Sequence, residues 1–236
     1  MADSSYSMLN AMVDIFAAPG KALDEIKLHT SWLWWPLIIT VLLASGLMLY
    51  YYNWVDFSWL IEETIRQLPA EDRAEGAGPI RQFMTVGTSS WTTVVAIAVM
   101  SLVIYTVQAT YLHLANNLTT GAEIGFGQWF SFSVWTSFVG VFGALAAFVV
   151  IFMADSNQLA GDKLQVLSLN SLIIHASPGD PLFTWGNSLT LINFWTLFLM
   201  SIGYARWTGA TFVKSSVIAV LPWALVFGVW GLMAWD

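Results

Sequence analysis

Long apolar runs alternate with shorter polar segments along this chain, and the runs set its architecture. A helix needs about 20 apolar residues to cross the hydrocarbon core of a bilayer. Aromatic residues cluster at both ends of the first run, as they do where a bilayer meets water. We therefore predict an all-α, polytopic membrane protein with five transmembrane helices, at about 32–52, 91–114, 129–153, 188–204 and 216–235.

The first 30 residues follow the pattern of an amphipathic helix rather than that of a span. Their apolar positions recur at the spacing of one helical face, and Pro19-Gly20 divides them into two short helices. Such an element lies along the membrane face, contacts a neighbouring protein or packs under its own bundle. The pattern predicts an amphipathic element at 1–30 and a five-span membrane domain at 31–236. The residues that we expect to contact a partner here are Ile15, Phe16, Pro19 and Leu23.

Two segments outside the predicted spans carry more apolar surface than a linker needs. The segment 56–68 is amphipathic, and 164–176 is an apolar patch between polar ends. Five helices cross a bilayer without such segments, so these two indicate contact with another protein. Within the first segment we expect Phe57, Leu60 and Ile61 to bind this partner.

Part of the sequence recurs 88 positions later without a gap. Thr120-Gly121-Ala122 falls on Thr208-Gly209-Ala210, and Trp135 falls on Trp223. The pattern favours two copies of one helix–turn–helix unit, formed by the second and third spans and by the fourth and fifth. The alternative is that the matching positions do not reflect a repeat, because membrane helices in general use the same few residue types. Small residues also recur and favour close helix packing, within the fold or against a partner: Gly140, Gly143, Gly228 and Gly231.

The amino-acid composition argues against several classes of function. Hydrophobic residues make up 57% of the chain and charged residues 10%, whereas a soluble domain carries about 25% charged residues. The net charge of −7 argues against binding to nucleic acid. The chain has no cysteine and three scattered histidines, which argues against a thiolate nucleophile and a structural metal cluster. We expect no catalysis, no metal and no cofactor, and we expect contact with membrane lipids.

Paired glutamates at Glu62-Glu63 with Arg66, and His113 with Asn117, resemble motifs of intramembrane proteases. Such an enzyme needs its acid, base and metal ligands at one depth in the bilayer. The glutamates fall in the amphipathic segment outside the spans, and His113 falls near the end of a span. The pattern therefore favours a non-enzymatic protein.

Strongly polar residues inside the predicted spans are few. The candidates are Gln108 and Asn193, with Thr106 and Thr196 nearby. A substrate pathway needs ionisable or strongly polar groups at mid-membrane, and none of these residues is charged. Hydrogen bonds between helices are the simpler interpretation, and a small oligomeric transporter or channel is the alternative function.

Four features together resemble the Yip family of five-span membrane proteins. The first is the entry element Ile15-Phe16-Ala17-Ala18-Pro19 with Leu23 and Ile26, followed by Trp34-Trp35-Pro36. The others are the five-span count, the turn Thr119-Thr120-Gly121-Ala122 after the second span, and a chain end at Asp236 close behind the last span. The chain lacks the long N-terminal region and the Asp-Leu-Tyr-Gly-Pro signature of eukaryotic members, so it resembles the short bacterial ones.

The resemblance implies a location and a role. It places the protein in the bacterial cytoplasmic membrane, with the N-terminus and both repeat turns in the cytoplasm and the C-terminus outside. Charge does not decide this orientation, because four basic residues fall on each side. Some bacterial members are similar to accessory proteins that help to assemble efflux ABC transporters of the MacB type with their adaptors. We therefore expect an accessory protein that binds another integral membrane protein, such as an ABC transporter permease.

Overall fold

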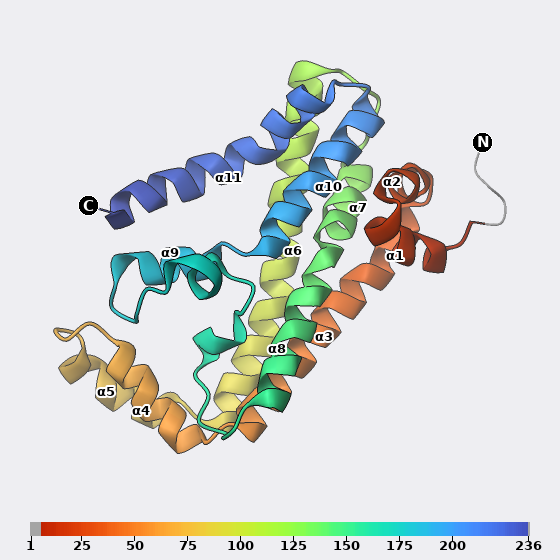
Figure 1. The fold of residues 1–236 in the computed structure, drawn as a ribbon. Coiled ribbons are helices and arrows are strands. Elements are labelled where there is room, and N and C mark those ends of the chain that lie inside the picture. Colours follow the sequence, from red (N-terminus) through yellow and green to blue (C-terminus); the bar gives the residue numbers. More distant parts are fainter. Residues whose placement is uncertain (1–5, 236) are drawn as a thin grey trace. The chain divides into compact units, whose positions relative to one another are not determined.

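The computed structural model describes residues 6–235, and its regular structure in that range is helical apart from one isolated bridge between Ser168 and Thr190. Figure 1 traces the elements in chain order. The first half contains α1 (Met8–Ala17), α2 (Pro19–Leu28), the 3-10 turn η1 (Thr30–Leu33), α3 (Trp34–Trp54), α4 (Phe57–Gln67), α5 (Arg73–Phe83) and α6 (Val86–Thr119). The second half contains α7 (Phe126–Ser137), η2 (Phe138–Gly140), α8 (Val141–Met153), η3 (Gly161–Leu164), the π-helical η4 (Asn170–Ile174), α9 (Pro181–Ser188), α10 (Leu191–Thr208) and α11 (Phe212–Trp235).

Among the described residues, four helical stretches are long and apolar enough to cross a membrane. They are Thr30–Trp54, Val86–Thr119, Phe126–Met153 and Phe212–Trp235, and each contains or overlaps a predicted span. The chain is thus a multi-pass membrane protein. The remaining predicted span corresponds to α10, a continuous helix of 18 residues that carries Arg206 in its last turn. Its role as a fifth span stays a prediction.

Some helix boundaries differ from those expected. Helix α6 begins at Val86, ahead of the apolar run, because the hydroxyl of Thr85 accepts the backbone N–H of Thr88 and caps the helix start. The fourth predicted helix begins at Leu191 rather than at 188, because α9 ends at Ser188 and Thr190 joins the β-bridge. Polar capping residues and a bridge between distant segments are invisible to the hydrophobic pattern.

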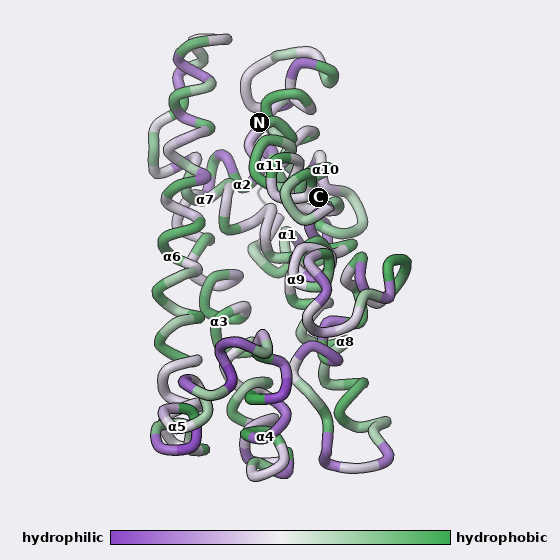
Figure 2. Tube along the Cα trace, turned by 90° about the vertical axis from the view of Figure 1, so that its left-hand side faces the viewer, coloured by the Kyte–Doolittle hydropathy of each residue, from purple (hydrophilic) through white to green (hydrophobic). Residues whose placement is uncertain are grey.

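The described residues fall into two compact units. The first unit draws on Met1–Val41, Met100–Gly140 and Ile192–Val229. The second draws on Leu42–Val99, Val141–Leu191 and Trp230–Asp236. The N-terminal element therefore groups with segments of the predicted membrane domain. Figure 2 shows apolar residues along most of α6 and α11, and polar residues gathered in connections such as the one between α4 and α5.

Aromatic side chains form the centre of the first unit. Trp129 on α7 stacks on Tyr204 of α10 with ring centroids 5.4 Å apart, and Phe132 meets Trp207 edge to face at 4.9 Å. All four side chains are buried. The approach of these helices requires Gly203, because a Cβ at this position would clash with the ring of Phe132. These contacts join α7 to α10.

A proline in α11 changes the hydrogen bonding of the first unit. Pro222 has no backbone N–H, so the carbonyl of Ile218, four residues earlier, loses its helical partner. The hydroxyl of Tyr111 on α6 donates to this carbonyl at 2.8 Å. Because hydrocarbon offers no replacement partner for a backbone group, this bond stabilises the contact between α6 and α11.

The end of α3 and helix α4 form the centre of the second unit. Tyr51, Val55 and Leu60 pack there against Ile151 of α8, and all four are buried. The hydroxyl of Tyr51 donates to the carbonyl of Leu159 at 2.7 Å, which ties the loop after α8 to α3.

Polar side chains fix the start and the surroundings of α4. Asp56 accepts the backbone N–H of Trp59 at 3.1 Å as the N-cap of α4, and this hydrogen bond lowers the pKa of Asp56. Glu62 accepts two hydrogen bonds of 2.9 Å from Arg81 on α5, which lower the pKa of Glu62. The cap and the ion pair explain why this polar segment folds as two helices.

Candidate functional site

The N-terminal hairpin, formed by α1 and α2, is fastened to the first unit on one side. Ser7 caps α1, and Pro19 opens α2 at a position where its missing N–H costs nothing. The inner side chains of the hairpin have no exposed surface: Ala11, Ile15, Ala22, Leu23 and Ile26. Burial of this side fixes the hairpin against the helices of its own unit.

Polar contacts from α7 and α10 add to this burial. The indole N–H of Trp207 donates to the carbonyl of Leu23 at 2.8 Å. In return, the ammonium of Lys27 donates to the carbonyl of Trp207 at 2.8 Å, near the negative end of α10. Two more contacts come from Gln128, which donates to the carbonyl of Lys27 at 3.2 Å, and from Arg206, which pairs with Asp24.

The two repeat turns share a backbone conformation. Gly121 and Gly209 have φ values of 64° and 72°, in the left-handed region that favours glycine after a helix end. The preceding threonine hydroxyl bonds the carbonyl four residues back in each turn, at 3.3 Å for Thr120 and 2.7 Å for Thr208. Each turn ends in a half-buried alanine, Ala122 or Ala210. The equivalence of the turns is consistent with a repeat.

Each helix that precedes a repeat turn has a terminal carbonyl that accepts a hydrogen bond from a lysine. Lys214 donates to the carbonyl of Thr119 at the end of α6 at 2.8 Å, as Lys27 does at the end of α10. The tryptophans that follow the turns differ, because Trp135 is fully buried whereas Trp223 is half-buried beside a cavity. Superposition of the two helix pairs therefore stays a prediction.

The outer side of the hairpin is apolar and exposed. Leu9 and Val13 stand one helical turn apart on α1, with 65% and 64% of their surface exposed. Phe16 is half-buried and packs near Phe138 with ring centroids 5.6 Å apart. Pro19 is half-buried as well. We call Leu9 and Val13 the outer face of the hairpin.

Two residues that were expected to contact a partner lie on the inner side instead. Ile15 and Leu23 have no exposed surface, so they hold the hairpin in place and leave nothing for a partner to touch. The apolar pattern of α1 runs around most of the helix. For this reason it did not separate the side that packs within the protein from the side that faces outward.

The apolar face of α4 is turned largely toward its own unit. Leu60 is 6% exposed within the core of the second unit, and Phe57 packs against that core beside Tyr52. Ile61 is half-buried. Leu60 is therefore a core residue rather than a partner contact, because the loop and helix ends around it cover the face that the pattern predicted.

The four glycines expected at helix contacts differ in their surroundings. A Cβ at Gly231 would stand 3.0 Å from the indole of Trp185, so this position is tightly packed. Within the described part of the chain, a Cβ at Gly140 or Gly228 would meet no atom within 4 Å. Gly143 is half-buried. The surroundings of an added Cβ are described for Gly140, Gly228 and Gly231. Of these three glycines, only Gly231 is explained by close packing inside a unit.

The polar residues expected inside the spans are both half-buried. Gln108 donates to the sulfur of Met200 at 2.9 Å and lines a cavity of about 250 Å³. The rest of this lining is mostly apolar and includes Ile104, Pro222 and Trp223. Asn193 is not among the lining residues.

The groups of the protease-like pattern have other partners. Glu62 pairs with Arg81, and Glu63 pairs with Arg66 at 2.7 Å. His113 contacts Asn117 at 3.3 Å, one helical turn along α6. The glutamates belong to the second unit and the His-Asn pair to the first. Among residues 6–235, no three histidine or acidic residues gather as metal ligands would.

Comparison with known proteins gives one match. The Yip1 domain family matches residues 13–233, from within α1 to near the end of α11. No curated protein and no solved structure matches the chain. Because the match covers most of the hairpin, both repeat turns and nearly the whole run of apolar helices, the chain belongs to the Yip1 domain family.

Proposed function

We propose that this protein is a non-enzymatic accessory subunit that binds another integral membrane protein and helps a membrane complex to assemble. The outer face of the N-terminal hairpin carries the proposal. Leu9 and Val13 are exposed on α1, whose opposite side is buried against its own unit, and α1 packs against α2, which the hydrogen bonds of Trp207 and Lys27 anchor. Exposed apolar side chains on a fixed element are typical of an interaction surface.

Anchoring of the hairpin favours a protein partner. Binding costs free energy when loops and side chains must be ordered, and a surface that is already fixed avoids much of this cost. The contacts of Trp207, Gln128 and Arg206 hold α2, and α1 packs against α2. The outer face is thus presented in one orientation.

The finer features follow from the family resemblance and the sequence pattern. The partner is an integral membrane protein, with an ABC transporter permease of the MacB type and its adaptor as the candidate complex. The protein lies in the bacterial cytoplasmic membrane with a cytoplasmic N-terminus, α10 is its fifth span, and the C-terminus is exported. The α6–α8 and α10–α11 pairs form two tandem repeats.

A small oligomeric transporter or channel is the alternative, supported by the cavity beside Gln108. This support is limited, because the amide of Gln108 already bonds Met200 and the remaining lining is mostly apolar. A transport pathway needs more polar groups than this cavity offers.

Co-purification from native membranes tests the accessory role. The variant Leu9→Ser/Val13→Ser removes the outer face and leaves the inner side intact. Each fully buried apolar side chain contributes about 1.5–3 kcal/mol, so the double variant is expected to lose more than about tenfold in partner recovery by mass spectrometry. The matched control Phe212→Ser/Val213→Ser changes two other exposed apolar side chains, at the start of α11, and is expected to retain the partner. Equal recovery with both variants contradicts the proposal.

A further inference from the structure

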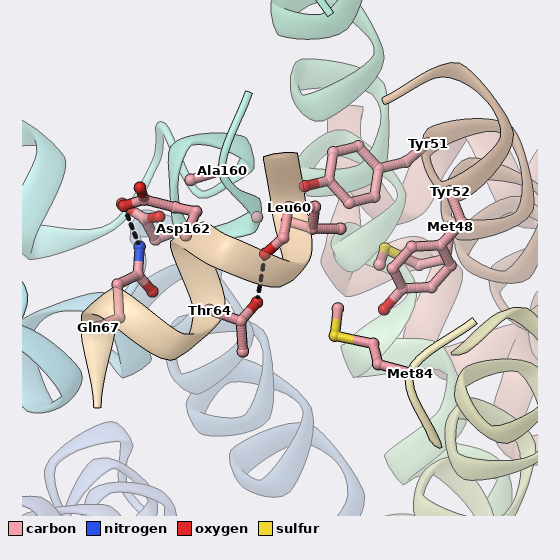
Figure 3. Close-up of a pocket in the computed structure, with 11 residues that line it drawn as sticks. Met48, Tyr51, Tyr52, Leu60, Thr64, Gln67, Met84, Ala160 and Asp162 are labelled. Carbon is pink, nitrogen blue, oxygen red and sulfur yellow. Dashed lines mark hydrogen bonds between the residues drawn. The ribbon is translucent and has the colours of Figure 1, made fainter. Parts of the chain in front are cut away.

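A second cavity, of about 230 Å³, lies in the second unit where α3 ends and α4 begins. Figure 3 shows its two ends. Asp162 and Gln67 stand at one end, and Tyr52, Met48 and Met84 at the other, with Thr64 between them. The cavity is therefore amphipathic, with a polar end and an apolar end.

Two carboxylates make the polar end negative. Glu63 and Asp162 both line the cavity, and only 17% and 14% of their side-chain surfaces are exposed. Among residues 6–235, no donor reaches the Oδ1 atom of Asp162, which is also closed to solvent. A buried carboxylate oxygen that no protein donor reaches is costly unless a positive charge lies near.

The basic residues near these carboxylates stand on the outside. Arg66 pairs with Glu63 at 2.7 Å and Lys163 lies 3.7 Å from Asp162, but their side chains are 66% and 68% exposed. Neither lines the cavity. Within the lining, Gln67 donates to Oε1 of Glu63 at 3.3 Å, and the ionisable side chains are two acidic ones and no basic one. This excess of carboxylates favours a cation inside.

The position of the cavity selects an amphiphile. Met48 and Tyr52 belong to the last turns of α3, where the first span ends in a cluster of tyrosines, and Glu63 belongs to α4 outside that span. Tyrosine-rich span ends lie at the level of lipid headgroups. A ligand at this depth presents a polar group toward α4 and an apolar segment toward α3.

We propose that this cavity binds the primary ammonium group of an amphiphile, with the adjoining apolar segment against Met48, Tyr52 and Met84. An ammonium donates three hydrogen bonds and accepts none, which suits the acceptors Glu63 and Asp162. Drug-sized ligands need about 300–1,000 Å³, so this smaller cavity takes the charged group and a short part of the chain. The ligand is an aminophospholipid headgroup or a free alkylamine, and the site does not depend on the proposed partner.

Binding measurements on the purified full chain in neutral detergent test the site with two probes. Decylammonium is measured by calorimetry against the neutral analogue decanol, and phosphatidylethanolamine against phosphatidylcholine by native mass spectrometry. Decylammonium is expected to bind at least about tenfold more tightly than decanol. Retention of phosphatidylethanolamine alone assigns the lipid as the ligand, and binding of decylammonium alone assigns a free amine; either supports the site.

Variants locate the binding in this cavity. Glu63→Gln and Asp162→Asn are each expected to weaken binding at least about tenfold. The neighbouring Glu62→Gln removes an equal charge outside the cavity and is expected to bind as the wild type does. Met84→Trp keeps both carboxylates and fills the apolar end, so it too is expected to lose binding, and circular dichroism checks the fold of each variant. Decanol binding as tightly as decylammonium, or unchanged binding in all three cavity variants, overturns the proposal.

Discussion

At the scale of single residues, the carbonyl of Ile218 shows how a membrane helix tolerates a proline. Pro222 removes the helical donor of this carbonyl, and Tyr111 replaces it from α6 at 2.8 Å. The sequence shows the proline. It does not show the tyrosine, because 107 positions separate Tyr111 from Ile218 and no local pattern connects them.

Substitutions at Tyr111 and Pro222 can be combined in a double-mutant cycle. Tyr111→Phe leaves the carbonyl of Ile218 without a donor and is expected to destabilise the protein by about 0.6–2 kcal/mol, the range of interhelical hydrogen bonds in membranes. In the Pro222→Ala background the helix supplies its own N–H, so the same change is expected to cost less. Tryptophan fluorescence during unfolding in detergent measures both. An equal cost in the two backgrounds contradicts the assignment.

Other residues that fix the candidate site also escaped the sequence pattern. Trp207, Lys27 and Gln128 join segments that are 100 or more positions apart. One feature of the sequence could have indicated these contacts: Arg206-Trp207 directly precedes the predicted turn Thr208-Gly209-Ala210. A basic and an amphipathic side chain at a helix end are placed to bond whatever packs beneath it.

At the scale of elements, hydrophobic periodicity found the helices but not what covers them. It predicted the helix at 56–68 and the division at Pro19-Gly20, and both are confirmed by α4 and by the α1–α2 hairpin. It assigned Leu60 and Leu23 to a partner, whereas both are buried within their own units. An apolar face must be covered, but its spacing does not say whether the cover belongs to the same chain.

The hairpin and α10 meet at a glycine, and this contact gives a prediction for the element. A Cβ at Gly203 would clash with the buried ring of Phe132 and stand 3.1 Å from Leu23. Gly203→Ala is therefore expected to destabilise the first unit by about 1–3 kcal/mol, the usual cost of overpacking.

The matched control for this prediction is Gly228→Ala. A Cβ there meets no atom within 4 Å in the described structure, and alanine favours a helix over glycine. Thermal unfolding in detergent is expected to show a lower midpoint for Gly203→Ala and an unchanged or higher one for Gly228→Ala. Equal midpoints for the two variants show that the hairpin is not packed against α10 as described.

At the scale of the whole molecule, composition and the run of apolar segments predicted a multi-pass helical membrane protein of the Yip family. The helices of membrane-crossing length and the match over residues 13–233 confirm this. The apolar pattern alone does not fix the span count, because α10 combines a length of 18 residues with a polar asparagine and an arginine.

A reporter fusion tests the span count and the orientation together. With α10 as a fifth span and a cytoplasmic N-terminus, alkaline phosphatase fused after Asp236 is expected to be active and a green fluorescent protein fused there to be dark. With four spans the two termini lie on the same side. A fluorescent fusion with inactive phosphatase therefore contradicts the five-span topology.

The accessory role rests on the outer face of the hairpin, so the most direct measurement places a photo-reactive amino acid at Val13. The full chain is expressed in its native membrane, illuminated, purified and analysed by mass spectrometry, with the same probe at the exposed Val213 of α11 as the control. The account predicts that the probe at Val13 cross-links one integral membrane protein in high yield, that the probe at Val213 does not, and that adding Leu9→Ser lowers this yield. Cross-links from Val13 to lipid alone, or an equal protein cross-link from Val213, contradict it.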